Sequence, residues 1–286
     1  MIITVTCNPA IDKTVYEDKT VFDIGGKGIN VSKVLNKLGS KSIATGFVGK
    51  DNMNLVIDDL NKIGIENHFI EVDGKVRTNT KLIVDGALTE NNEDGPKITS
   101  EEIEKLFTYL KTFSNDIVVI SGSAPSSADR NIYKNMIELL KDNNNYVILD
   151  CDKDLFKNAI EAKPNVIKPN KEEICKYFGI EYNEEEIIEK CKDLGIDFIC
   201  LSLGEDGAIF IGDQIYKCKA LPIKCSSTVG AGDSMVAAIA HSKANAFDVD
   251  KTVKLVMAAA SAACETEGTK APEYDSIMEK YNDLCN

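Results

Sequence analysis

Residues 226–238 read SSTVGAGDSMVAA, a tight turn of small residues that opens into an apolar helix. Gly230 and Gly232 can adopt positive φ and bring backbone amides against a ligand with no Cβ in the way. The unpaired amides at the start of the helix form a cradle for anions. Asp233 has the wrong charge to bind an anion, but it suits a base beside a transferring phosphoryl group. The alternative is that Asp233 only complements the helix dipole.

Short β-rich runs alternate with helix-period stretches along the rest of the chain. The expected strands are 2–6, 116–121, 146–150, 165–168 and 198–203, and the expected helices are 101–111, 132–141, 232–243 and 248–265. This alternation is typical of a mainly parallel sheet with crossover helices, so we expect an α/β fold. Residues 1–286 show no repeat, linker or break in composition, and we expect a single domain.

One region departs from this alternation. Residues 69–72 and 78–84 are β-rich with no helix between them, and residues 14–24 are also extended. We expect these segments to form a small antiparallel flap that covers a ligand at the carboxyl ends of the strands.

Composition excludes several classes of function. The chain has 33 Lys and Arg against 46 Asp and Glu, a net charge of −13, which repels nucleic acids and anionic membrane surfaces. No apolar stretch reaches the roughly 20 residues of a membrane helix. Nine cysteines without a C-x-x-C pair, and only two histidines, disfavour a zinc site. We expect a cytoplasmic protein with no nucleic-acid or membrane partner.

A second glycine-rich turn, Gly25-Gly26-Lys27-Gly28, precedes Asn30. Its glycines let the backbone approach a polyhydroxylated ligand, and Asn30 can donate to and accept from sugar hydroxyls. Asp12 lies just after the first strand, at the sheet edge where ligands bind in such folds. The phosphate loop G-x-x-x-x-G-K-[ST] and a dinucleotide G-x-G-x-x-G after a strand are both absent, which disfavours ordinary NTPases and dehydrogenases.

With both glycine motifs at their spacing, the sequence resembles the PfkB (ribokinase-like) carbohydrate kinase family from Thr4 to about Lys270. Residues 8–14 and 227–236 are more similar to the fructose 1-phosphate kinases (1-phosphofructokinases) than to the tagatose 6-phosphate kinases. The resemblance implies a three-layer α/β/α fold with a small β lid at about 13–24 and 68–90. It also implies Mg²⁺ with ATP as phosphoryl donor, a sugar phosphate as acceptor, K⁺ near the carbonyls of residues 227–229, and a homodimer.

The resemblance also implies a role for individual residues. Asp233 is then the catalytic base, and Gly230, Ala231 and Gly232 form the anion hole for the transferred phosphate. The residues expected to bind the sugar phosphate are Asp12, Gly25, Gly26, Lys27, Asn30, Arg77, Asn79 and Ser123, with Arg77 holding its phosphate. The residues expected to bind the nucleotide are Lys168, Asn170, Ser202, Gly204, Gly207, Thr228 and Ser261. Glu173 is expected to bind Mg²⁺ through water.

The chain departs from this family pattern in the lid. Only residues 17–24 separate Tyr16 from the Gly25-Gly26 turn, and at about 3.3 Å per residue they allow one strand but not two strands and a turn. We therefore expect a shortened lid. The sequence leaves open an ATP-dependent fructose 1-phosphate kinase, a kinase for tagatose 6-phosphate or fructose 6-phosphate, and a sugar-phosphate or nucleotide-binding protein with reduced catalysis.

Overall fold

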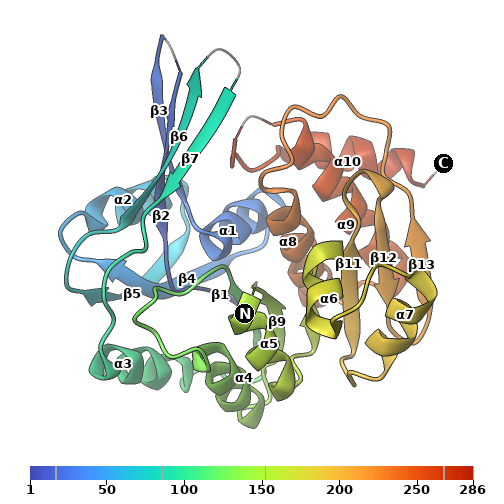
Figure 1. The fold of residues 1–286 in the computed structure, drawn as a ribbon, viewed down its shortest axis with the longest axis horizontal. Coiled ribbons are helices and arrows are strands. Elements are labelled where there is room, and N and C mark those ends of the chain that lie inside the picture. The colour runs from blue at the N-terminus through green and yellow to red at the C-terminus, as the bar shows by residue number, and fades with distance from the viewer. Residues whose placement is uncertain (17, 85–86, 152, 267, 286) are drawn as a thin grey trace.

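The computed structural model describes residues 1–286 apart from residues 17, 85, 86, 152, 267 and 286 (Figure 1). Within this part of the chain, a nine-stranded sheet is covered by helices on both faces, and a second sheet of four strands projects from one end (Figure 1). The three-layer α/β/α architecture expected from the sequence is confirmed.

The central sheet supplies the frame of the molecule. Its strands are β1 (Ile2–Thr6), β4 (Ser42–Gly49), β5 (Glu66–Val72), β8 (Ile117–Ser121), β9 (Tyr146–Asp150), β10 (Val166–Ile167), β11 (Phe198–Ser202), β12 (Ala208–Ile211) and β13 (Ile215–Cys218). They lie in the order β13-β12-β11-β10-β9-β8-β1-β4-β5. Among these described strands only β12 runs opposite to all the others, so the carboxyl ends of the other eight lie at one edge.

Burial on both faces explains why these strands are continuous apolar runs rather than alternating ones. All five residues of β1 are buried. Ile3 and Val5 pack into one helix layer, while Ile2 packs into the other. β1 thus contributes to both halves of the core.

Helices form the two outer layers. One face carries α3 (Ser100–Leu110), α4 (Ile132–Asp142), α5 (Lys153–Ala159), α6 (Lys171–Phe178) and α7 (Glu184–Lys192). The other carries α1 (Lys27–Lys37), α8 (Ala231–Ala244), α9 (Val249–Cys264) and α10 (Tyr274–Asp283). α2 (Met53–Lys62) packs in a smaller cluster with α1 and β4, and two 3₁₀ turns span Ile160–Ala162 and Gly204–Asp206. No described helix combines the length and apolar character that crossing a membrane requires.

The four-stranded sheet, called the lid here, is built from two hairpins. Its strands are β2 (Ala10–Val15), β3 (Thr20–Gly25), β6 (Arg77–Val84) and β7 (Ala87–Asn92), in the order β3-β2-β6-β7. β2 pairs antiparallel with β3 and parallel with β6, and β6 pairs antiparallel with β7. The short segment before Gly25 supplies one strand, β3, as its length allows.

The expected antiparallel flap is wrong in two respects: the lid is a mixed sheet, because β2 pairs in parallel with β6, and residues 69–72 lie outside it. Residues 69–72 belong to β5, which pairs in parallel with β4 at the edge of the central sheet, with Phe69 opposite Gly46. The lid therefore begins at Arg77 in this part of the chain, not at residue 68. Local β-propensity shows that a segment is extended, but the partner strand decides which sheet it joins.

Candidate active site

Asp233 lies in the first turn of α8 and is buried, with 6% of its surface exposed. Its Oδ2 accepts a hydrogen bond from Asn30 Nδ2 at 2.8 Å, and Asn30 lies in the first turn of α1. Burial raises the pKa of Asp233 to about 6, and the negative charge of Asp150 adds to this rise. The carboxylate is therefore ionised near neutral pH and basic enough to accept a proton.

Backbone amides at the start of α8 lie in the same helical turn as this base. Gly230 caps α8 with φ of 83°, in the left-handed region that favours glycine. The first bond of the helix ladder runs from Ser234 N to Gly230 O at 2.9 Å, so the amides of Ala231, Gly232 and Asp233 precede the ladder. The expected anion hole thus lies at the helix terminus that carries the base.

Asp150, the last residue of β9, is buried and forms the centre of a partly buried ionic cluster. Its Oδ1 lies 3.4 Å from Lys27 Nζ and 3.3 Å from Lys168 Nζ, and its Oδ2 accepts from Ser121 Oγ at 3.3 Å. Burial acts to raise the pKa of Asp150, but the two ammonium groups outweigh it and the net shift is downward. These four residues, called the Asp150 cluster here, keep two positive charges near Asp233.

Sequence reasoning assigned Lys27 and Lys168 to different ligands and missed Asp150. The structure brings both lysines to one carboxylate, and a Cβ on Gly232 would lie 3.3 Å from Lys168 Nζ. Lys168 therefore contacts the start of α8. The available signal was the position of Asp150 at the end of an expected strand, on the sheet edge where ligands bind.

One face of the lid carries the polar residues expected to bind sugar. In the β2–β6 register Asp12 lies opposite Asn79, and Asn79 Nδ2 donates to Asp12 Oδ1 at 2.9 Å. Because residues two apart share a face of a strand, Arg77 and Lys81 lie on the same face as Asn79. Burial raises the pKa of Asp12, and the cations of Lys81 and Arg77 oppose that rise. Lys81 is a second cation here that sequence reasoning missed.

Several buried polar atoms at this place have no hydrogen-bond partner among the described residues. They include Asn30 Oδ1, Asn79 Oδ1 and Arg77 Nε. Buried polar groups are nearly always paired in folded proteins. All three belong to residues expected to bind the sugar phosphate, so the lid and α1 present unsatisfied donors and acceptors suited to a polar ligand.

The remaining residues expected to bind the sugar lie around this region. Gly25 ends β3, where a Cβ would lie 2.2 Å from Asp12 Oδ2, and Gly26 caps α1. Ser123 follows β8, and its carbonyl accepts from Tyr133 at 3.2 Å.

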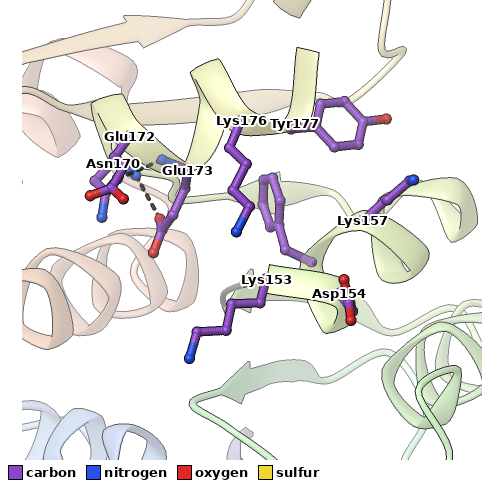
Figure 2. A pocket seen from close by; sticks show the side chains of 9 residues that line it. Lys153, Asp154, Lys157, Asn170, Glu172, Glu173, Lys176 and Tyr177 are labelled. Carbon is purple, nitrogen blue, oxygen red and sulfur yellow. Dashed lines mark hydrogen bonds between the residues drawn. The ribbon is translucent and has the colours of Figure 1, made fainter. Parts of the chain in front are cut away.

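Asn170 and Glu173 cap the amino terminus of α6. Glu173 N donates to Asn170 Oδ1 and Asn170 N donates to Glu173 Oε2, both at 2.8 Å (Figure 2). They line a pocket of about 360 Å³, toward which Lys153 of α5 and Lys176 of α6 extend (Figure 2). Burial raises the pKa of Glu173, and the Asp150 cluster is close enough to influence its charge. The expected metal and nucleotide residues are therefore also a helix cap.

The other expected nucleotide residues fall into two groups. Ser202, Gly204 and Gly207 lie at the turn between β11 and β12, where Ser202 forms a bridge with Asn170. Thr228 is exposed before α8, and Ser261 is buried in α9. Among the described residues, no group of three His, Cys, Asp or Glu side chains is placed to hold a metal ion.

Comparison with known proteins is consistent with this geometry. Residues 1–276 match the family described as pfkB family carbohydrate kinase. A 1-phosphofructokinase from Borreliella burgdorferi is 33% identical over 294 residues, covering 94% of this chain and 95% of that protein. A solved structure assigned as a phosphofructokinase from Staphylococcus aureus has a TM-score of 0.88 at 33% identity, covering 99% of this chain and 97% of that chain.

A further solved structure supports the fold. Phosphofructokinase-2 from Escherichia coli, in complex with potassium, has a TM-score of 0.92 at 24% identity, covering 100% of this chain and 99% of that chain. The resemblance read from the two glycine motifs is confirmed. The chain belongs to the pfkB family of carbohydrate kinases, which are phosphotransferases with an alcohol group as acceptor.

Proposed function

We propose that this kinase transfers the γ-phosphoryl group of ATP to fructose 1-phosphate, giving fructose 1,6-bisphosphate. The placement of Asp233 carries the proposal, because it puts a buried base with a raised pKa in the first turn of α8, beside amides that precede the helix ladder. Asp233 would remove the proton of the C6 hydroxyl as that oxygen attacks the phosphoryl group. The amides at the start of α8 would offset the negative charge on the transferring oxygens.

The polar face of the lid supports a phosphorylated sugar as acceptor. Asp12, Asn79 and the unpaired oxygen of Asn30 suit sugar hydroxyls, because carboxylate and amide groups bind them directionally. Arg77 and Lys81 supply two cations on the same face, which suits the phosphate already on the sugar. The similarity to the Borreliella burgdorferi 1-phosphofructokinase favours fructose 1-phosphate among the phosphosugars.

A kinase of this family uses ATP with a divalent metal, and we propose Mg²⁺. Glu173 fits it, because only Oε2 of its carboxylate is used in the α6 cap. Lys27 and Lys168 would face the nucleotide phosphates. Bound Mg²⁺ would neutralise phosphate charge during transfer. The Escherichia coli phosphofructokinase-2 was solved in complex with potassium, which supports the proposal of K⁺ near the carbonyls of residues 227–229.

The test measures ADP release from MgATP with fructose 1-phosphate, tagatose 6-phosphate or fructose 6-phosphate, comparing kcat/KM for the three sugars. Fructose 1-phosphate should give the highest value. In Asp233→Asn, kcat should fall by roughly 10² or more, the scale of losing a general base. Circular dichroism and nucleotide binding of the variant should stay unchanged.

Three contrary results would each overturn a different part of the proposal. A higher kcat/KM for another phosphosugar would replace fructose 1-phosphate as the substrate and keep the mechanism. Near-normal turnover by Asp233→Asn would overturn the role of the base. Tight sugar-phosphate binding without ADP formation by folded wild-type protein would favour a binding protein with reduced catalysis.

A further inference from the structure

Two cysteines distant in sequence meet beside the segment that leads into the anion hole. Cys225 lies between β13 and α8, and Cys264 is the last residue of α9. The amides of Ser226 and Ser227 donate to the Cys264 carbonyl at 2.7 and 3.2 Å, which fixes the two backbones against each other. The Cys225 side chain is close enough to that of Cys264 to affect its pKa. A disulfide needs Cα atoms about 4.4–6.8 Å apart, and the backbone hydrogen bonds beside Cys225 hold its segment against Cys264.

The surroundings of the pair allow an oxidant to reach it. Cys225 is exposed and Cys264 is partly buried, whereas Cys7, Cys151 and Cys200 are fully buried. Burial raises the pKa of Cys264 to about 11, and Cys225 adds to the rise, so Cys264 stays a neutral thiol near pH 7. The exposed Cys225 is thus the residue that reacts first with an external oxidant.

The pair sits where a small displacement would affect phosphoryl transfer. The chain runs from Cys225 through Ser227, whose Oγ accepts from Val229 N at 3.1 Å, to Gly230 at the start of α8. Thr228 O in turn accepts from Ala231 N at 3.4 Å. A change at Cys225 is therefore transmitted by a short, hydrogen-bonded turn to the amides beside Asp233.

We propose that Cys225 and Cys264 are an oxidative modification site, which hydroperoxides convert to a disulfide that slows phosphoryl transfer. The Cys225 thiolate attacks one peroxide oxygen, the O–O bond breaks, and a sulfenic acid forms while the other oxygen leaves as an alcohol or water. The Cys264 sulfur then attacks the sulfenic sulfur, the S–O bond breaks, and the departing hydroxide takes the thiol proton to form water. Two thiols are oxidised by two electrons and one hydroperoxide is reduced.

The disulfide would change the turn because it shortens the distance between the sulfurs to about 2.0 Å. The displacement of residues 226–229 would move the Gly230 cap and misplace the amides of α8. A misplacement of about 1 Å at a reacting centre costs roughly 10²-fold in rate. We expect kcat to fall by about tenfold or more, and a dithiol reductant to restore it by thiol–disulfide exchange. The effect on kcat rests on the proposed kinase function.

The experiment treats the reduced protein with hydrogen peroxide and follows intact mass, free thiols and ADP release. Peptide mapping should find Cys225 joined to Cys264 with the loss of two hydrogen atoms, and dithiothreitol should reverse both the link and the loss of kcat. Cys225→Ser and Cys264→Ser should keep their basal activity and resist inactivation. Cys285→Ser is the matched control, since Cys285 is exposed but lies at the far end of the chain, and it should be inactivated like wild type.

The two parts of the proposal fail separately. If no Cys225–Cys264 link forms under conditions that oxidise Cys285, the modification site is overturned, whatever the kinase activity. If the link forms and kcat is unchanged, the control of transfer is overturned. If the reduced protein shows no kinase activity, the mapped disulfide still tests the site, and the proposed function fails instead.

Discussion

The ionised carboxylate of Asp233 is disfavoured by its buried position. Its pKa rises from 3.8 to about 6, chiefly through burial, so the folded state binds its proton more tightly than the unfolded state. Because the pKa of Asp233 is raised, its protonated carboxyl contributes fully to fold stability below about pH 4. This contribution is lost as pH rises through about 6. Above that pH, the ionised base costs about 3 kcal/mol of folding free energy.

Removing this charge should therefore stabilise the fold while it stops the reaction. We expect Asp233→Asn to raise the free energy of unfolding at pH 7.5 by about 1–3 kcal/mol, because Asn keeps the acceptor for Asn30 without the buried charge. Urea unfolding measures this. Asp213→Asn, an equal change of charge at an exposed site, is the control. It should change the free energy of unfolding by less than about 0.5 kcal/mol. A destabilised Asp233→Asn would contradict this cost of the buried charge.

Asp150 should contribute to the pH at which Asp233 works, because its charge adds to the rise in the Asp233 pKa that burial causes. The base acts when deprotonated, so kcat/KM should rise with pH through the Asp233 pKa, near 6. Asp150→Asn removes a negative charge that raises this pKa and leaves Lys27 and Lys168 to lower it. The rise in kcat/KM should therefore move to lower pH, although the maximal rate should also fall. An unmoved pH profile in a folded variant would show that Asp150 acts only as a structural group.

At the scale of the element, α6 combines a helix cap with a candidate metal ligand. Glu173→Gln should keep the cap, because a glutamine oxygen can still accept from Asn170 N, but it removes the carboxylate charge. We expect an unchanged melting temperature and a raised Mg²⁺ requirement, measured by titrating Mg²⁺ at fixed ATP.

α3 offers the matched control for this change. Its cap pairs Thr99 with Glu102 in the same arrangement, but on an exposed surface. Glu102→Gln should leave the Mg²⁺ requirement unchanged. An equal response in the two variants would show that Glu173 only caps its helix.

The elements also show where sequence reasoning succeeds and fails. The buried strands β1, β8, β9, β10 and β11 and the Ala-rich helices α8 and α9 were predicted from apolar patterns within one segment, but the equally buried β4 was not. β12, β13 and α10 were not expected from the sequence, since short edge elements depend on packing rather than on a strong pattern of their own. The placement of β5 was wrong because pairing across the sheet decided it.

The residues of the candidate site divide in the same way, into those predicted from a local motif and those placed by packing. Asp233, Asn30 and Asp12 stand in motifs that bring the required backbone with them, so their neighbourhood was predictable. Asp150 and Lys81 carry no motif. Their neighbours come from tertiary packing, which places Asp150 beside Lys27 of α1 and Lys168 after β10.

At the scale of the whole molecule, the lid has a second face that turns away from Asp12. Phe22 and Leu82 lie on it, because Phe22 pairs with Lys13, Lys13 with Thr80, and Leu82 shares the face of Thr80. Phe22 is 62% exposed and Leu82 is 41% exposed. Apolar side chains gathered on a projecting sheet are typical of an interface.

We therefore expect a homodimer that uses this face. Light scattering after size exclusion should give about twice the 31.3 kDa chain mass. Phe22→Ser should shift the protein toward monomer because it removes an apolar contact. Ile215→Ser, at an exposed apolar residue of β13 far from the lid, should not. A monomeric wild-type protein would exclude this assembly.

The hydrogen bond between Asn30 and Asp233 joins residues 203 positions apart. A ribosome makes α1 and the lid strands early in each round of synthesis, whereas α8 emerges only after most of the chain. The nascent chain thus holds its sugar-facing residues well before it holds a base. We therefore expect translation products that stop short of α8 to be inert as kinases, so that interrupted synthesis releases no enzyme able to consume ATP.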